Sequence, residues 1–266
     1  MLDAGERKGE SGLIIAWIAA VAALSYVSFV LPTQWVFVSR VRVPLGLGKR
    51  IVQVSDLHVE KLRVSPERLR RMIARERPDY IFLTGDYTQR LRHVPKVDAY
   101  LGAVLDVGVP VYAVFGNHDY RLKLDVGMLF RLFRERGIPV LRNESVRLDG
   151  FTLVGIDDFV SAMARVEKAF EGVGPEETTV VIAHDPNVTL RIRRPFHYLM
   201  CGHLHGKQFR LPFLYYLKRK GPLAKKGIYK GLHQNEWGTF YISKGIGQAQ
   251  INARFLVRSE LTVHDL

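Results

Sequence analysis

Short apolar runs rich in β-branched and aromatic residues recur along most of the chain, and they constrain its fold more than any other feature. Seven such runs occupy residues 51–54, 80–84, 111–115, 151–156, 179–183, 198–201 and 239–243. Amphipathic stretches lie between them. One is expected to begin after Ser65 with Pro66 at its first position, one to end at Gly137, and one to cover residues 162–170. This alternation predicts an α/β domain whose last third is richer in strand.

Polar motifs follow five of these predicted strands. They are Asp56-Leu57-His58, Gly85-Asp86, Gly116-Asn117-His118-Asp119, His184 and Gly202-His203-Leu204-His205-Gly206. Ligands bind outside the carboxyl ends of strands in open α/β sheets, so we expect these side chains to converge on one pocket. Asp56 and His58, two residues apart, are expected to face the same side where their strand ends, and His203 and His205 repeat the spacing.

The residue types in these motifs predict a pair of divalent metal ions. Carboxylate, amide oxygen and imidazole together suit Mn²⁺, Fe²⁺ or Zn²⁺. Two ions about 3.5–4 Å apart need a bridging oxygen, and Asp86 is the natural candidate. The single cysteine, Cys201, excludes an intrachain disulfide and a cysteine-rich zinc module.

The complete motif set resembles that of the calcineurin-like metallophosphoesterases, from about Arg50 to the C-terminus. The resemblance implies two β-sheets packed face to face with helices outside. It implies one metal site made by Asp56, His58, Asp86 and His205, and a second made by Asp86, Asn117, His184 and His203. His118 resembles the family's histidine that is not a ligand, stabilises the transferring phosphoryl group and protonates the leaving group, with Asp119 orienting it. Mn²⁺ is the favoured ion, with Fe²⁺ or Zn²⁺ as alternatives.

Two further segments make the chain similar to a smaller branch of that family. They are Gly155-Ile156-Asp157-Asp158 and Ser243-Lys244-Gly245-Ile246-Gly247. Together with the apolar N-terminus they resemble bacterial membrane-associated enzymes, which include phosphodiesterases and UDP-2,3-diacylglucosamine pyrophosphatases of lipid A synthesis.

The N-terminal region contains an uncharged, mostly apolar run over residues 13–31. At about 1.5 Å per residue a helix of this length reaches ~28 Å, close to the ~30 Å hydrocarbon core of a bilayer. We therefore expect a tail over residues 1–12, a transmembrane anchor over 13–31, a linker over 32–49 with Pro32, Pro44, Gly46 and Gly48 as breakers, and a catalytic domain over 50–266. The alternative is a cleaved signal peptide, because Ala20-Val21-Ala22 resembles a cleavage site.

The basic residues beside the run indicate its orientation. Arg7 and Lys8 precede it, whereas Arg40, Arg42, Lys49 and Arg50 follow it. Positive-inside counting predicts a single-pass protein of the cell inner membrane with a cytoplasmic catalytic domain.

The formal net charge of +13 indicates an anionic partner. Much of the excess lies in residues 207–235, which contain no acidic residue and eight basic ones, interleaved with aromatic and apolar side chains. We call this the basic-aromatic segment. A solvated loop is the alternative, but contact with anionic lipid or a lipid-bearing substrate accounts for both halves of the composition. Arg90, Lys207, Phe213 and Tyr216 are expected to contact the substrate.

The predicted function is hydrolysis of a phosphodiester or pyrophosphate bond in a lipid-linked substrate such as UDP-2,3-diacylglucosamine. The alternative is a phosphodiesterase or phosphatase acting on a soluble or cell-envelope substrate. A nuclease would suit the net charge. It is disfavoured because the charge is concentrated in an aromatic segment and the chain has an apolar anchor. A scaffold without catalysis is disfavoured because no metal or catalytic position is missing.

Overall fold

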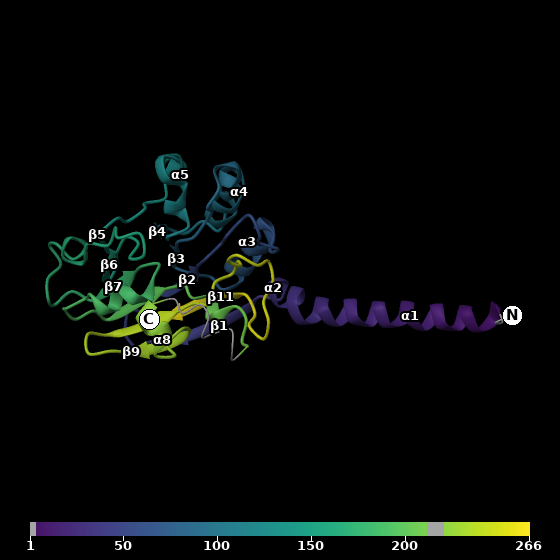
Figure 1. The fold of residues 1–266 in the computed structure, drawn as a ribbon. Coiled ribbons are helices and arrows are strands. Elements are labelled where there is room, and N and C mark those ends of the chain that lie inside the picture. The colour runs from purple at the N-terminus through teal and green to yellow at the C-terminus, as the bar shows by residue number, and fades with distance from the viewer. Residues whose placement is uncertain (1–3, 212–220) are drawn as a thin grey trace.

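The computed structural model describes residues 4–211 and 221–266, with only the backbone of residues 4–9. Two β-sheets pack face to face between layers of helix, and a long helix projects from one end of the molecule (Figure 1). The expected α/β fold with two sheets is confirmed.

Within the described residues the first sheet contains five strands in the order β1-β11-β2-β3-β4, and the second contains six in the order β5-β6-β7-β8-β10-β9. The first sheet is made of β1 (Phe37–Arg42), β11 (Glu260–Asp265), β2 (Arg50–Val54), β3 (Tyr80–Thr84) and β4 (Val111–Val114). The second is made of β5 (Glu144–Leu148), β6 (Phe151–Gly155), β7 (Thr179–Ile182), β8 (Tyr198–Cys201), β10 (Thr239–Ile242) and β9 (Gly231–Gln234). The central strands β2-β3-β4 and β6-β7-β8-β10 are parallel, so their carboxyl ends lie along one edge.

Three helices cover the outer face of the first sheet. They are α3 (Pro66–Arg75), α4 (Val94–Leu105) and α5 (Val126–Glu135). The expected start of the first is confirmed, because the Ser65 hydroxyl accepts a hydrogen bond from the Arg68 N–H. The outer face of the second sheet packs against α6 (Val166–Ala169), the 3₁₀ helix η4 (Pro186–Leu190) and α8 (Gly221–Lys225).

Alternate residues of the central strands enter different cores. In β3, Phe82 faces the layer between the sheets, whereas Ile81 and Leu83 pack under the helices. Val180, Ile182 and other residues of the second sheet meet Phe82 from the opposite side. Both faces of these strands are buried, which explains why they read as continuous apolar runs rather than alternating ones.

The structure differs from the sequence expectations at the ends of the domain. Residues 37–42, expected to be linker, form β1, which pairs in parallel with β11. Pro44, Gly46 and Gly48 suggested a linker. Residues 37–42 nevertheless form a strand, because their hydrogen-bond partners lie in β11, more than 200 positions later in the chain. Strands β5, β9 and β11 were also not expected, and the helix expected over 162–170 is only the single turn α6.

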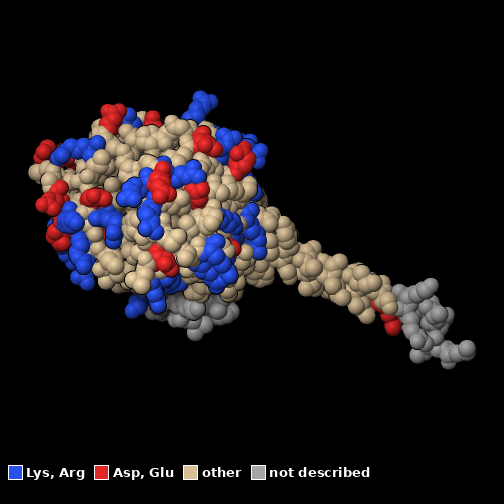
Figure 2. All heavy atoms as spheres, turned by 90° about the horizontal axis from the view of Figure 1, so that it is seen from above, with Lys and Arg blue, Asp and Glu red and all other residues tan. Residues whose placement is uncertain are grey.

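The apolar N-terminal run is helical throughout. It comprises α1 (Ala4–Ser25), the π-helical segment η1 (Tyr26–Val30) and α2 (Leu31–Gln34). Over residues 10–34 the helix is long and apolar enough to cross a membrane. Figure 2 shows it as a rod that is uncharged except for an acidic residue near its far end, projecting from a domain whose surface carries mixed charges. An exposed apolar surface of this size indicates a membrane or a partner rather than water.

Candidate metal centre

The five polar motifs lie in loops that are hydrogen-bonded to one another. The Asp56 N–H donates to the Gly85 carbonyl at 3.0 Å, and the His58 N–H donates to the Asp86 carbonyl at 2.9 Å. In the second sheet the Gly202 N–H donates to the His184 carbonyl at 2.9 Å. The loops are therefore held in register by their own backbones, which fixes the directions of the side chains that they carry.

Backbone strain is concentrated in these loops. Positive φ angles of 40° to 69° occur at Asp56, His58, Asp86, His203 and His205. Residues other than glycine avoid this left-handed region of backbone conformation. Holding one there costs roughly 1–3 kcal/mol of folding free energy, so the surrounding contacts must enforce it. Asp56 and His58 thus converge because the chain turns through left-handed residues, and not because they continue the alternation of a strand.

Two glycines are required by close approach. A Cβ on Gly116 would lie 2.4 Å from Asp86 Oδ1 and 2.7 Å from the His184 ring. A Cβ on Gly202 would lie 2.4 Å from Asp56 Oδ2. No side chain fits at either position without displacing a polar group of the centre.

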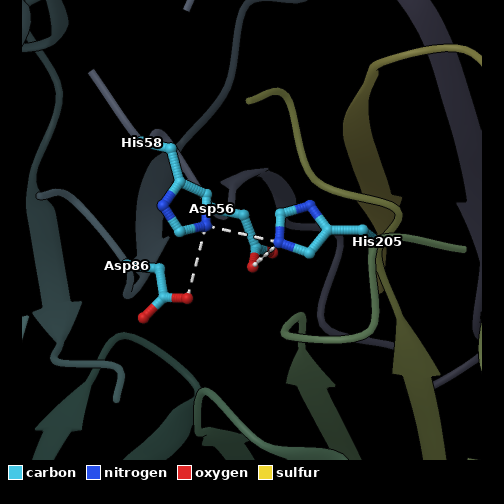
Figure 3. A group of neighbouring side chains, drawn as sticks. All are labelled: Asp56, His58, Asp86 and His205. Carbon is cyan, nitrogen blue, oxygen red and sulfur yellow. Dashed lines mark hydrogen bonds and ion pairs between the residues drawn. The ribbon is translucent and has the colours of Figure 1, made fainter. Parts of the chain in front are cut away.

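The first group of candidate ligands consists of Asp56, His58, Asp86 and His205 (Figure 3). His58 Nε2 lies 3.4 Å from Asp86 Oδ2 and 3.3 Å from His205 Nε2, and His205 Nε2 lies 3.2 Å from Asp56 Oδ1. All four side chains are buried. Imidazole nitrogens and carboxylate oxygens that point at a common centre from different loops form a donor set able to bind a cation.

A second group shares Asp86 with the first and adds His184 and His203. His184 Nε2 lies 3.2 Å from Asp86 Oδ2 and 3.2 Å from His203 Nδ1. Asn117 stands between Gly116, which lies against Asp86 and His184, and His118, whose N–H donates to Asp86 Oδ1. The buried Oδ1 of Asn117 has no hydrogen-bond partner among the described residues. A buried amide oxygen without a partner is costly, so this atom fits a metal ligand.

Electrostatics also favour a cation here. Burial alone would raise the pKa of Asp86, but the charge of His184 and the hydrogen bond between them outweigh burial and hold that pKa well below its ordinary value. Burial would likewise lower the pKa of His184, yet Asp86 raises it well above the ordinary value. The pocket therefore stabilises positive charge despite being closed to water.

His118 lies at the edge of this centre. Its backbone N–H donates to Asp86 Oδ1 at 2.8 Å, and its ring packs edge-on against His58 with centroids 4.7 Å apart. The ring Nδ1 lies 2.8 Å from Gln89 Oε1, and Arg121 donates to the same oxygen at 3.0 Å. Gln89 and Arg121 were not anticipated, although each follows a motif aspartate or histidine by three residues.

Asp119 is buried and binds backbone groups of the motif loops. Its carboxylate accepts backbone hydrogen bonds from Asp86 at 2.8 Å, Gly116 at 2.9 Å, Tyr87 at 2.8 Å and Thr88 at 3.1 Å. It therefore fixes two motif loops against each other. At the ring of His118, Nδ1 lies 2.8 Å from Gln89 Oε1, and the expected orienting role of Asp119 stays a prediction.

Arg254 is a second unanticipated residue. It is fully buried, and its guanidinium donates to the carbonyls of Lys244 at 2.8 Å, Gly245 at 2.9 Å and Gly247 at 2.6 Å. A longer contact of 3.4 Å reaches the His205 carbonyl. The Gly247 N–H in turn donates to the Asp56 carbonyl at 2.9 Å. One buried arginine thus holds the loop behind two candidate ligands.

The structure describes two of the four residues expected to contact the substrate, Arg90 and Lys207. Arg90 is exposed, and the guanidinium beside His118 belongs to Arg121 instead. The Lys207 ammonium lies 4.0 Å from the centre of the Tyr229 ring. Phe213 and Tyr216 lie outside the described residues.

A cavity of 780 Å³ adjoins the centre at Asn117. Three cations line it, Arg121, Lys123 and Arg142, together with apolar side chains. The apolar part is Tyr120, Leu124, Val126, Phe130, Val160 and Met163. Leu124 is 99% exposed.

Together, the two-sheet fold and the cluster of aspartate and histidine side chains define a metal-dependent phosphoesterase. Residues 49–207 match the family model described as calcineurin-like phosphoesterase. The chain belongs to this family, as the motifs indicated, and it is an enzyme of the phosphoesterase class.

Several relatives agree with this placement. The chain is 38% identical over 232 residues to the uncharacterized metallophosphoesterase YkoQ of Bacillus subtilis, covering 84% of this chain and 86% of that protein. It is 28% identical over 232 residues to phosphodiesterase YaeI of Escherichia coli, covering 82% of each chain. It is also 28% identical over 246 residues to the bovine transmembrane protein with metallophosphoesterase domain, covering 83% of this chain and 54% of that protein.

Proposed function

We propose that this protein is a dinuclear-metal-dependent hydrolase of a phosphodiester or pyrophosphate bond in a membrane lipid-linked substrate. UDP-2,3-diacylglucosamine is the representative candidate. The observation that supports hydrolysis most strongly is the pair of buried donor groups that share Asp86, with His118 beside them.

In this proposal Asp56, His58, Asp86 and His205 hold one ion, and Asp86, Asn117, His184 and His203 hold the other. Mn²⁺ suits this mixture of oxygen and nitrogen donors, with Fe²⁺ or Zn²⁺ as alternatives. When bound, the two ions would supply an activated water and stabilise charge on the phosphoryl group. Asp86 belongs to both sets and is the proposed bridge.

We assign His118 the protonation of the leaving group. Gln89 contacts Nδ1 at 2.8 Å, so proton transfer is assigned to Nε2. Arg121, whose guanidinium lies 3.3 Å from the same Nδ1 and which also lines the adjoining cavity, is placed to bind a substrate phosphate oxygen. Gln89 acts through His118 and is a positioning residue.

The cavity beside Asn117 supports a substrate that is both anionic and apolar. Its cations suit phosphate, whereas Leu124, Val160 and Met163 would contact hydrocarbon or another apolar group. This surface adds to the basic-aromatic segment, which we propose to lie near lipid. The apolar helix is the proposed anchor of a single-pass inner-membrane protein with a cytoplasmic catalytic domain.

A Mn²⁺-supplemented hydrolysis screen tests this proposal against its alternatives. It compares lipid-linked diphosphates, small soluble phosphodiesters and single-stranded nucleic acid with the full chain in detergent. Preference for an acylated substrate is expected. Equal rates on acylated and soluble substrates would support the alternative of a soluble or cell-envelope substrate, and preference for nucleic acid would indicate a nuclease.

Variants of the apolar residues in the cavity beside Asn117 test whether these residues contact the substrate without taking part in hydrolysis. Leu124→Ser with Val160→Ser should raise the KM for an acylated substrate and leave hydrolysis of a small phosphodiester nearly unchanged, because the metal centre is intact. Met128→Ser, at an exposed apolar position of α5 outside the cavity lining, is the matched control. An equal proportional loss on both substrates would reject the apolar wall as a substrate contact.

A further inference from the structure

A second cavity lies where the apolar helix joins the domain. Its volume is 540 Å³. Its walls come from segments far apart in sequence: Val27, Ser28, Pro32, Phe37, Lys230, Lys244, Phe255, Leu256, Val257 and Arg258. We call it the junction cavity. It contains none of the candidate metal ligands.

The helix is fastened to the domain at this point. The Arg254 N–H donates to the Phe29 carbonyl at 2.9 Å, and the Ser259 N–H donates to the Pro32 carbonyl at 2.9 Å. The Phe29 and Phe255 rings stack with centroids 5.2 Å apart. In Figure 1 the loop that carries residues 250–258 lies beside α2. The cavity is therefore a feature of the folded structure, with both walls bonded to each other.

The junction cavity carries excess positive charge. Lys230, Lys244 and Arg258 line it, and Lys244 pairs with Glu260 at 2.7 Å. Burial lowers the pKa of Lys230, and the nearby cations Arg210 and Lys244 lower it further. An anion in the cavity would relieve this repulsion.

Aromatic rings hold two of these cations. The Arg258 guanidinium lies 4.1 Å from the Trp35 ring centre and 5.1 Å from that of Phe37. The Lys244 ammonium lies 4.9 Å from the Phe37 ring centre. Leu256 in the cavity wall is 65% exposed, and Trp35, beneath Arg258, is 57% exposed. Amphipathic rings and exposed apolar side chains beside cations are typical of surfaces at the membrane interface.

The position of the cavity along the helix corresponds to the level of the lipid head groups. If residues 13–31 cross the hydrocarbon core, at about 1.5 Å per residue, Val27 to Pro32 lie at the border nearest the domain. The three cations then stand at the level of lipid phosphates. The exposed apolar residues of α1 directly precede Val27 and Ser28 of the cavity wall, in position to contact acyl chains.

We propose that the junction cavity binds the phosphate head group of an anionic membrane lipid, with its acyl chains along α1. This inference rests on the proposed membrane position of the helix, but not on the proposed hydrolysis or its substrate. The phosphate would contact Lys230 and Arg258, and the lipid would fix the domain against the bilayer surface.

Native mass spectrometry of the full chain in neutral detergent tests the proposal without any turnover. The protein is titrated with phosphatidylglycerol or with phosphatidylcholine of the same acyl chains. One phosphatidylglycerol molecule should bind at least about tenfold more tightly than phosphatidylcholine. Lys230→Gln and Arg258→Gln should each weaken phosphatidylglycerol binding about fivefold, and the double variant about 30-fold, as expected for cations at a membrane surface.

Lys96→Gln is the matched control, since Lys96 is exposed on α4 and lies outside the cavity. It should not change binding, and circular dichroism of each variant checks folding. Equal affinity for the two lipids, or equal loss in the Lys96 variant, would overturn the proposal. Displacement of the lipid by millimolar inorganic phosphate would instead identify a site for a free anion, and would overturn the lipid assignment.

Discussion

The metal centre and the junction cavity both collect charged side chains at loops, but they do so in opposite ways. In the metal centre the charged groups are buried and point at each other across distances of 3.2–3.4 Å. At the junction two of the three cations, Lys244 and Arg258, lie over aromatic rings and are partly open to solvent. A buried centre can specify the positions of small ions, whereas an exposed one can accept a head group whose position varies.

Backbone conformation accounts for much of this difference. Five candidate ligands adopt left-handed backbone conformations that only a closely bonded environment enforces. Among the three junction cations, Lys230, Lys244 and Arg258, none has a positive φ. We therefore expect substitutions in the metal centre to have large, specific effects and those at the junction to have small, graded ones.

The largest effect is expected for Asp86→Ala. Removing the proposed bridge should abolish binding of both ions and reduce hydrolysis by more than the roughly 10⁴-fold maximum for one acid–base group, while the domain still folds. Elemental analysis of the purified variant measures the metal content. Asp98→Ala, which removes a partly exposed carboxylate paired with Arg136, is the control and should retain both ions. Two ions retained in the Asp86 variant would contradict the bridging role.

His118→Ala should give the next largest effect. Because His118 is not a proposed ligand, both ions should remain, while turnover falls by about 10²–10⁴. Metal content and kcat are measured on the same sample. A parallel loss of metal and activity would make His118 a ligand instead.

Arg254 and Arg258 lie in one loop, and replacing each of them compares how much the metal centre and the junction depend on a single arginine for stability. Arg254→Met removes a buried guanidinium and leaves carbonyls behind the metal loops unpaired, so it should lower the free energy of unfolding by on the order of 3 kcal/mol or more. Arg258→Met, at the junction, should change it by less than about 1 kcal/mol. Urea unfolding of both variants measures the two values. If both variants lowered the free energy of unfolding equally, the buried Arg254 would stabilise the protein no more than the partly exposed Arg258 does.

The last prediction concerns a histidine that is buried without a carboxylate partner. His264 is as buried as His184, but burial lowers its pKa to about 3, although the charge of Asp265 opposes the shift. A histidine with a depressed folded pKa stabilises the fold above its unfolded pKa near 6.5, and this stability is lost as pH falls toward 3. Between pH 7 and pH 5 the loss should be about 2 kcal/mol.

Unfolding by urea at several pH values measures this slope in the wild type and in His264→Asn. The other titrating groups are common to both proteins, so the difference in slope reports His264 alone. Identical slopes would show that folding does not lower the pKa of His264. His264 Nδ1 lies 2.8 Å from the Tyr198 hydroxyl and Nε2 lies 3.1 Å from Gln53 Oε1, which identifies the contacts that protonation would disturb.

The strands of the central sheets could be predicted because their residues are apolar on both faces, and burial on both faces produces continuous runs that are visible locally. β1 and β11 could not. β1 carries exposed arginines and β11 contains Glu260 and His264, so neither resembles a buried strand until the two ends of the chain pair. The helix α4, with Pro95 in its first turn, was also not anticipated.

The sequence by itself determined the chemistry of the metal centre, because aspartate, asparagine and histidine at the ends of predicted strands can be recognised one motif at a time. Tertiary structure alone decided what surrounds them: Gln89 on His118, Asp119 on the backbone of two loops, and Arg254 behind His205. It also decided the junction cavity, whose cations come from ordinary surface positions on separate segments. The physical reason is that ligand chemistry belongs to a side chain, whereas orientation, burial and shared charge belong to contacts between residues that are distant in sequence.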